Sequence, residues 1–279
     1  MATTMTDEAA VAGTGIDASV PHSARIWNYW LGGKDNYAVD REAGDAWLAI
    51  HPEITVIARE TRAFLNRSVR YLAGEVGIRQ FLDVGTGLPT ADNTHEVAQR
   101  VAPDARIVYV DNDPLVLAHA RALLTSTPEG STRYLHADMH DSAALIEGAA
   151  EILDFEQPVA VYFMGVLGHI HDLEEAQTLV KGLMDRVPPG SYLTICDSTH
   201  AAESGAFQQA QEEYAETGAV AYWNRYPEEI ASFFDGLEWV EPGFVSVPTW
   251  RPEQPTGVTV LPVDPPAFLD HFGGMARKP

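Results

Sequence analysis

From residue 78 onward, short apolar segments alternate with segments of helical periodicity, and this alternation limits the folds open to the chain. The apolar segments have the length of buried strands, whereas the amphipathic segments between them are long enough for helices. Such alternation favours a parallel sheet with helices on both faces, joined by right-handed crossovers. Five strands, each running into a loop, are expected in residues 78–85, 106–113, 131–141, 158–170 and 190–199.

The helices between these strands carry boundary signals. Asp113 precedes Pro114, which combines an N-cap residue with a proline at the first helical position. Asp172 and Glu175 have capping-box spacing, and the sequence Pro-Pro-Gly (188–190) ends the helix that they begin. The expected helices span residues 94–102, 114–124, 142–155 and about 172–187.

The C-terminal part departs from this alternation. FVSVPTW (244–250) and GVTVLPV (257–263) predict two strands joined by a Pro-rich loop, hence an antiparallel hairpin at one sheet edge. The segment at about 200–235 is long for one crossover and predicts a helical insertion, with helices over 203–217 and 227–234. The predicted fold class is α/β: a Rossmann-like sheet of parallel strands plus an antiparallel C-terminal hairpin.

Composition argues against several kinds of partner. The 279 residues include 18 basic and 40 acidic side chains, and the net charge of −22 repels nucleic acid and anionic membranes. No apolar run approaches the roughly 20 residues of a membrane helix, and residues 1–20 lack the features of a signal peptide. The single cysteine, Cys196, forms no intrachain disulfide. We expect a cytoplasmic protein with no nucleic-acid or membrane partner; the oligomeric state stays open.

The loop DVGTGLPT (83–90) is the first candidate ligand site, because open α/β sheets bind ligands beyond the carboxyl ends of their strands. Gly85 and Gly87 allow a tight turn and a close approach of ligand to backbone. A purely structural turn from strand to helix uses glycine as well. A dinucleotide fingerprint has Gly or Ala where this chain has Thr90, so the loop favours a ligand without a pyrophosphate over NAD.

Acidic residues follow the next two expected strands. Asp111 ends the second strand, where a carboxylate accepts hydrogen bonds from both hydroxyls of a ribose. Asp138 follows the third strand and is placed to accept from an adenine amino group, with Met139 against the ring. Each acidic residue alone is more often a cap or a solvated loop residue. Their recurrence at successive strand ends indicates a nucleoside site.

These loops resemble the nucleoside-binding loops of class I methyltransferases that depend on S-adenosylmethionine (SAM). Over about residues 20–270 the chain is similar to one bacterial S-adenosyl methyltransferase family, formerly catalogued as a domain of unknown function. Gly168 departs from the family pattern, which favours a histidine before His169, and this argues against a two-histidine role. Four segments carry the resemblance: HSARIWNYWLGGKDNYAVDREAGD (22–45), RQFLDVGTGLPT (79–90), VYVDNDPLVLAHARALL (108–124) and VLGHIHD (166–172).

The resemblance implies SAM as cofactor and S-adenosylhomocysteine (SAH) as product. Arg62 would pair with the methionine carboxylate of SAM, although an Arg on an amphipathic helix is by default a surface residue. The implied cofactor-binding residues are Arg62, Asp83, Gly85, Thr86, Gly87, Asp111, Asn112, Asp138, Met139, Met164 and Gly165.

His169 is the candidate general base, and a structural role for it is equally open. His171, beside Asp172, is interpreted as a neighbour of a helix N-terminus. No metal site is expected, since HADMH and HIH match no recognised ligand spacing.

The aromatic stretch RIWNYWLGGKDNYAVD (25–40) precedes the first expected strand. In class I methyltransferases, appended helices close the cofactor site and shape the acceptor pocket, so the resemblance implies such a cover. The alternative, that these aromatic residues only pack a helical subdomain against the sheet, is equally open, and it applies also to AYWNRY (221–226). The candidate acceptor-binding residues are Tyr29, Lys34, Asn36, Tyr37, Tyr222 and Trp223.

The expected organisation is a disordered tail (1–20), a helical cover (21–76) and a SAM-binding domain (77–279). The predicted function is transfer of a methyl group from SAM to a small-molecule acceptor. Two alternatives remain open. One is a protein that uses SAM without methylating, because the sequence forces no catalytic base. The other is an NAD-dependent oxidoreductase, which Leu88, Pro89 and Thr90 disfavour.

Overall fold

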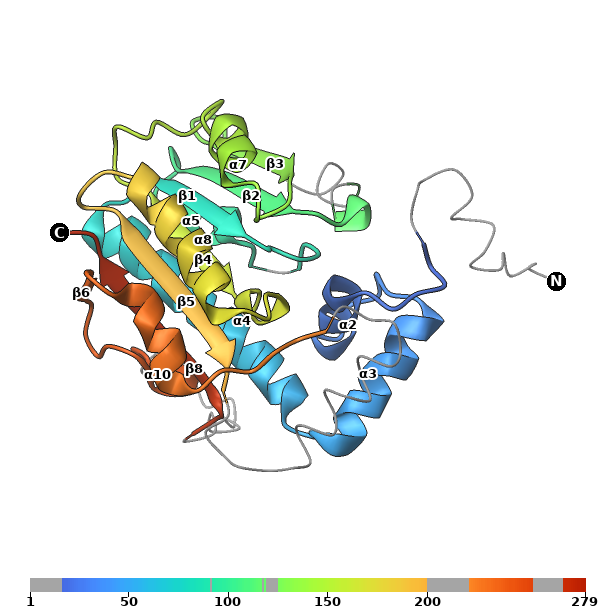
Figure 1. Cartoon of the computed structure of the whole chain (residues 1–279). Coiled ribbons are helices and arrows are strands. Elements are labelled where there is room, and N and C mark those ends of the chain that lie inside the picture. The colour runs from blue at the N-terminus through green and yellow to red at the C-terminus, as the bar shows by residue number, and fades with distance from the viewer. Residues whose placement is uncertain (1–16, 91, 117, 119–124, 200–220, 253–267) are drawn as a thin grey trace, which may run out of the picture.

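The computed structural model describes residues 17–90, 92–116, 118, 125–199, 221–252 and 268–279 (Figure 1). Within these ranges one mixed sheet has the strand order β3-β2-β1-β4-β5-β8-β6, and β7 also pairs with β8. Strands β1 to β5 are parallel to one another, whereas β8 runs antiparallel to β5, β6 and β7. The predicted fold class is therefore confirmed.

The parallel strands fall inside the five predicted ranges. The central strands β1 and β5 are buried along their whole length, which explains their nearly continuous apolar sequences. Strand β1 lies between β2 and β4, so the strand order reverses at this point and ligands of open sheets bind there. The bounds are β1 (Gln80–Val84), β2 (Arg106–Asp111), β3 (Ser131–His136), β4 (Ala160–Met164) and β5 (Tyr192–Ser198).

The antiparallel edge differs in detail from the predicted hairpin. It consists of β6 (Glu238–Trp239), β7 (Val245–Ser246) and β8 (His271–Arg277). The predicted strand over 244–250 is wrong beyond Ser246, because the 3-10 turn η4 (Val247–Thr249) contains Pro248, which cannot donate to a sheet. The predicted strand over 257–263 lies outside the described residues. Strand β8 pairs with all of β5 instead.

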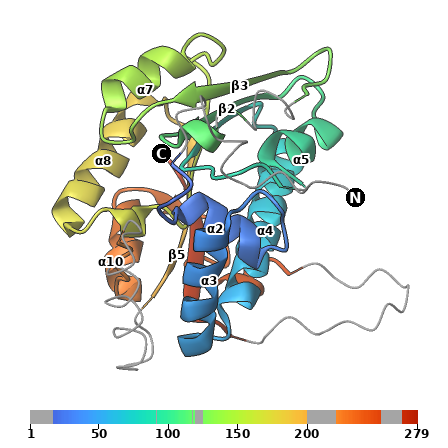
Figure 2. The same cartoon turned by 90° about the vertical axis from the view of Figure 1, so that its right-hand side faces the viewer.

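Helices cover both faces of the sheet (Figure 2). Residues of α7 (Ser142–Ala149), α8 (Leu173–Arg186), α10 (Pro227–Ala231) and the 3-10 turn η3 (Ser232–Phe234) form one core with the sheet. Residues of α4 (Ile54–Arg70), the π-helical turn η1 (Tyr71–Val76) and α5 (Thr94–Val101) form the core on the other face. No helix in the described ranges is long and apolar enough to cross a membrane.

Several predicted helix boundaries are confirmed. Asp172 accepts a hydrogen bond from Glu175 N at 2.8 Å, and Asp113 accepts one from Leu115 N at 2.8 Å, so both aspartates act as N-caps. The helix predicted over 142–155 ends earlier, at Ala149. The predicted helix over 203–217 and most of the one over 114–124 lie outside the described residues, whereas 227–234 forms α10 and η3.

The helices α2 (Ser23–Trp30) and α3 (Ala38–Ile50) stand beside the carboxyl ends of the strands (Figure 1). With the first turns of α4 and with Leu269 they form a separate apolar cluster. A buried ion pair joins α2 to α3, with 3.0 Å between Arg25 Nε and Asp40 Oδ1. Helix α4 belongs to both parts of the molecule, because Ile57 packs in the helical cluster while Phe64 packs against the sheet. Through α4 the sheet positions the cover.

Candidate functional site

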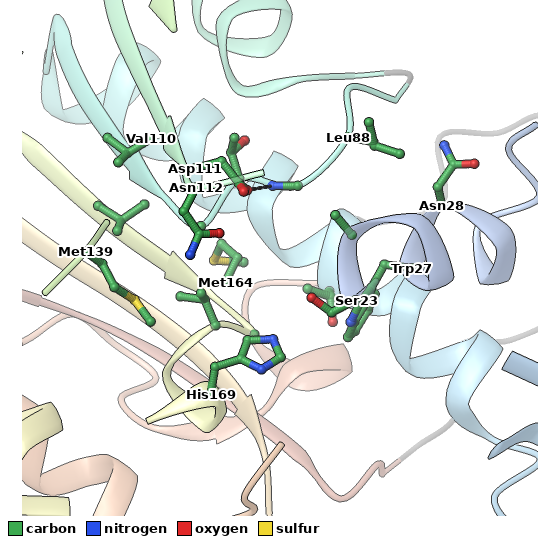
Figure 3. Close-up of a pocket in the computed structure, with 18 of the residues that line it drawn as sticks. Ser23, Trp27, Asn28, Leu88, Val110, Asp111, Asn112, Met139, Met164 and His169 are labelled. Carbon is green, nitrogen blue, oxygen red and sulfur yellow. Dashed lines mark hydrogen bonds between the residues drawn. The ribbon is translucent and has the colours of Figure 1, made fainter. Parts of the chain in front are cut away.

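A cavity of about 280 Å³ lies beyond the carboxyl ends of β1, β2 and β4, at the point where the strand order reverses (Figure 3). Loops after the strands form one side of it, and α2 and α4 form the other. The predicted base His169 lines the cavity, from the 3-10 turn η2 (Leu167–His169). So do ten of the eleven residues predicted to bind cofactor: Arg62, Gly85, Thr86, Gly87, Asp111, Asn112, Asp138, Met139, Met164 and Gly165.

The glycine loop after β1 is tied to β2, since Gly85 N and Thr86 N both donate to the carbonyl oxygen of Val110, at 2.8 and 3.2 Å. Gly85 and Gly87 have φ angles of 71° and 67°, in the left-handed region that favours glycine. A Cβ at Gly85 would lie 2.3 Å from Val166 Cγ2, so packing requires this glycine. At Gly87 the nearest atom would be 4.0 Å away, so this glycine borders open space.

The Asp111 carboxylate joins the glycine loop to the end of β2. Its Oδ2 accepts from Gly87 N at 2.8 Å (Figure 3), and its Oδ1 accepts from Asp113 N at 3.0 Å. Burial raises the pKa of Asp111, and the two backbone hydrogen bonds act in the opposite direction. Each carboxylate oxygen has a second lone pair, so the group holds the loop and still has acceptors for a ligand.

Asp83, the eleventh predicted cofactor residue, does not line the cavity. It is 3% exposed near the end of β1, and its Oδ2 accepts from Thr94 Oγ1, the first residue of α5, at 2.6 Å. Burial raises the pKa of Asp83 to about 6, opposed by the hydrogen bond from Thr94 and by the charge of Arg62. In this structure Asp83 connects β1 to α5 behind the loop.

Arg62 reaches the cavity from α4. Its Nη2 donates to the carbonyl oxygen of Asp92 at 2.8 Å. Burial lowers the pKa of Arg62, while nearby acidic groups, Asp83 foremost, raise it. A guanidinium remains ionised at neutral pH, so the cavity contains a cation next to the glycine loop.

The loops after β2 and β3 form the wall that faces α2. Met139 and Asn112 point into the cavity across from Trp27 (Figure 3). Asp138 is exposed, and its Oδ1 accepts from both the backbone N and the Nδ1 of His140, at 2.9 and 2.6 Å. The backbone hydrogen bond from His140 lowers the pKa of Asp138, so this loop presents an ionised carboxylate at neutral pH.

Helix α2 contributes a set of lining residues that the sequence interpretation did not select. They share a helical period, so one face of α2 and the turns flanking it point at the strand ends. Four of them have the spacing i, i+3, i+4 and i+7, namely Ala24, Trp27, Asn28 and Leu31. This spacing identifies one face of the helix but does not say what that face covers. The lining residues of this segment are His22, Ser23, Ala24, Trp27, Asn28 and Leu31.

Four predicted acceptor-binding residues of the cover do not line this cavity. Tyr29 donates its hydroxyl to Asp45 Oδ1 at 2.7 Å, which joins α2 to α3 on the outer side. Asn36 donates to Asn28 Oδ1 at 3.0 Å and so shapes the turn after α2. Lys34 is exposed, and Tyr37 is half-buried with the Arg25 guanidinium over its ring. A role for these four in acceptor binding stays a prediction.

A second, smaller cavity of about 40 Å³ adjoins the first, and Ser23, Trp27 and His169 line both. Tyr222, another predicted acceptor-binding residue, lines the smaller cavity, and its ring stands edge-on to that of His169 with centroids 5.0 Å apart. Trp223 is exposed and packs on His171, with ring centroids 4.1 Å apart. The structure thus brings Tyr222 next to the predicted base and leaves Trp223 outside.

Comparisons with known proteins agree with this geometry. A family model described as S-adenosyl methyltransferase matches residues 9–279. A DUF574 family protein from Streptomyces avermitilis MA-4680 is 42% identical, with a TM-score of 0.86 over 94% of this chain and 99% of that chain. A proposed methyltransferase from Thermobifida fusca YX is 38% identical, with a TM-score of 0.83 over 96% of this chain and 97% of that chain. None of the curated proteins compared with the chain matches it significantly.

The family match covers nearly the whole sequence, and both structural relatives share the cover as well as the sheet because they align over almost their full lengths. The cofactor is SAM and the product of its use is SAH, as the resemblance implied. The chain belongs to the S-adenosyl methyltransferase family and is a SAM-dependent methyltransferase.

Proposed function

We propose that this enzyme methylates a small-molecule acceptor, with SAM in the larger cavity and His169 as the general base. The observation that carries the proposal is the position of His169, which lines both cavities. An acceptor that reaches from the smaller cavity would meet the cofactor beside Ser23, Trp27 and His169, which line both cavities. A methyltransferase must hold the acceptor close to the methyl group of the cofactor, because this positioning supplies much of the rate enhancement.

The residues of the larger cavity fit SAM. The open space at Gly87 lets a ligand approach the loop backbone, and the Asp111 carboxylate accepts from ribose hydroxyls. Met139 and Asp138 suit the face and the amino group of an adenine, and the Arg62 cation suits the methionine carboxylate. When bound, SAM supplies an electrophilic methyl group: its bond to sulfur breaks with the electron pair left on sulfur, while a bond to the acceptor heteroatom forms.

His169 has the tautomer that a base requires. Its Nδ1 lies 3.1 Å from the carbonyl oxygen of Ala221, and because a carbonyl only accepts, Nδ1 carries the proton. The neutral ring then has its lone pair on Nε2. Burial lowers the pKa of His169, so the ring is neutral at pH 7 and Nε2 is ready to take a proton from an acceptor hydroxyl or amine.

The test uses SAM with a deuterated methyl group, incubated with the enzyme and a mixture of small-molecule metabolites. We expect SAH to form together with a product that carries the label, detected by mass spectrometry. His169→Asn retains a donor for Ala221 but removes the base, and should reduce turnover by roughly 10²-fold or more at unchanged SAH affinity. His171→Asn, at the neighbouring exposed histidine, is the matched control and should turn over normally.

SAH formation without any labelled small molecule would contradict the proposal, because it would mean that SAM is used for another chemistry. Full turnover by the His169→Asn enzyme would remove the base from the mechanism.

A further inference from the structure

Among the described residues, the smaller cavity has aromatic walls and no ionised lining. Three tryptophans from the cover, Trp27, Trp30 and Trp47, line it together with Tyr222. The described residues around it include no Asp, Glu, Lys or Arg. Its volume of about 40 Å³ holds roughly three water-sized groups, which is the space of a hydroxyl or amino group and the ring edge that carries it; the rest of such a ring would extend along Trp27, which lines both cavities. Its size and lining suit a flat, uncharged group.

Two polar groups at this cavity have already donated their protons elsewhere. His169 Nδ1–H donates to Ala221, which leaves only an acceptor at Nε2. The hydroxyl of Tyr222 donates to the buried carboxylate of Asp197 at the end of β5, so it has no proton left for a ligand. Neither group can therefore donate to a ligand, and His169 Nε2 can accept from one.

Ser198 is the third such group, and a buried chain of hydrogen bonds fixes its proton. Thr61 Oγ1 donates to the carbonyl oxygen of Ile57 at 2.8 Å, so it must accept from His271 Nε2–H, 2.9 Å away. His271 is fully buried and burial lowers its pKa to about 3, so the ring is neutral and its Nδ1 accepts. The Ser198 hydroxyl, 3.1 Å from Nδ1, is the donor. The Ser198 oxygen can therefore accept a hydrogen bond from a ligand, but its proton is already donated to His271.

Asn224 lines the same cavity from the other side. It is 9% exposed, and neither its Oδ1 nor its Nδ2 has a hydrogen-bond partner among the described residues. A buried amide without partners costs roughly 1–3 kcal/mol, so such a group marks a place where a ligand supplies the missing bonds.

We infer that the smaller cavity is the acceptor subsite and that it selects a neutral aromatic ring carrying a hydroxyl or amino group. The walls suit the ring, and the lone pairs of His169 and Ser198 suit an O–H or N–H donor. An ether at the same position would leave these acceptors unpaired, and a carboxylate would face lone pairs without a cation. The inference rests on the proposed function, because it names the acceptor of that reaction.

Binding of four fluorinated probes, followed by ¹⁹F NMR, tests the inference with and without SAH. We expect 4-fluorophenol and 4-fluoroaniline to bind at least about tenfold more tightly than 4-fluoroanisole, which lacks the donor, and 4-fluorobenzoate not to bind. Calorimetry with SAH is done separately. Failure to bind SAH overturns the proposed cofactor site, whereas SAH binding without probe selectivity overturns only the present inference.

Two variants locate the probes. Ser198→Ala and Asn224→Leu should each weaken 4-fluorophenol binding about tenfold, and Ser198→Ala should leave 4-fluoroanisole binding unchanged. Ser68→Ala is the matched control, because Ser68 is a buried serine on α4 that donates to Leu65 and does not line the cavity. If both cavity variants bind 4-fluorophenol as the wild type does, or if no probe binds, the smaller cavity does not select such a ring and the inference is wrong.

Discussion

The Asp111 carboxylate accepts a hydrogen bond from Gly87 N at 2.8 Å, so the residue predicted to hold the ribose also holds the glycine loop. A second bond, from Asp113 N, fixes the other oxygen. The two loops that surround the proposed nucleoside site therefore share one side chain. We therefore expect a substitution of Asp111 to change the shape of the loop as well as the affinity for the ligand.

Asp111→Ala should weaken SAH binding by on the order of 2–3 kcal/mol, from lost charge-assisted hydrogen bonds. It should also lower the free energy of unfolding by about 1–3 kcal/mol, because two backbone N–H groups lose their acceptor. Calorimetry and chemical denaturation measure the two effects. Asp113→Asn, a cap residue outside the cavity, is the control and should keep its SAH affinity. Wild-type affinity in Asp111→Ala would refute the role assigned to Asp111.

The two glycines of the loop should respond differently to alanine. Gly85→Ala places a Cβ 2.3 Å from Val166 and should mainly lower the melting temperature. Gly87→Ala meets no atom closer than 4.0 Å, so it should cost only about 1 kcal/mol, from its positive φ. Its Cβ borders the cavity, and SAH affinity should fall by more than the stability does. Equal SAH affinity in wild type and Gly87→Ala would mean that the ligand does not approach this loop.

The raised pKa of Asp83 leads us to expect that the stability of the protein depends on pH. Its pKa rises from about 3.8 in the unfolded chain to about 6 in the fold, so the folded protein binds the proton more tightly. This tighter proton binding stabilises the fold; the stabilisation is complete below pH 4 and is lost as the pH rises toward 6. Relative to Asp83→Asn, the wild type should lose about 2–3 kcal/mol of unfolding free energy over this range. Urea denaturation at pH 4 and pH 7 measures the difference, and a pH-independent difference would contradict the prediction.

Gly168 makes room for Tyr222. A Cβ there would lie 2.4 Å from Tyr222 Cζ, and Trp223 N donates to Gly168 O at 2.7 Å. Gly168→Ala should therefore displace the Tyr222 ring and weaken 4-fluorophenol binding at unchanged SAH affinity. Gly182→Ala, in α8 with open space at its Cβ, is the control and should leave binding unchanged. Unaltered probe binding in Gly168→Ala would show that Tyr222 does not shape the acceptor subsite.

The parallel half of the fold and the strand-end loops could be predicted because their signals are local. A glycine loop after a buried strand and an aspartate at the end of the next strand have fixed places once the sheet is parallel. Strand β8 could not be predicted in this way. Its sequence HFGGMAR has two glycines and no β-branched residue, and the strand exists because it pairs with β5, more than seventy positions earlier in the chain.

The helical cover shows a different limit of prediction from the sequence. Its existence could be predicted from the aromatic stretch, but residue type alone favoured Tyr29, Lys34 and Asn36 as ligand contacts. The orientation of α2 gives Trp27 and Tyr29 different surroundings: Trp27 lines the cavity, while Tyr29 donates to Asp45 of α3, and a ligand contact at Tyr29 stays a prediction. Helical periodicity identifies two faces of α2, and only tertiary packing tells which one covers the site.

If helix α2 covers the site, substitutions on the face that lines the cavities should change ligand affinity more than stability. Trp27 is half-buried and lines both cavities, so Trp27→Ala should weaken SAH and 4-fluorophenol binding by more than it lowers stability. Ile26, one position earlier, is fully buried in the helical cluster and lines neither cavity, so Ile26→Ala should cost about 2–5 kcal/mol of stability and leave the affinity of the folded protein unchanged. Hydrogen exchange gives a second test of the same helix. In the wild type, amide hydrogen exchange over Ser23–Trp30 should slow when SAH binds. Equal exchange with and without SAH, together with wild-type affinity in Trp27→Ala, would mean that α2 has only a structural role beside the strand ends.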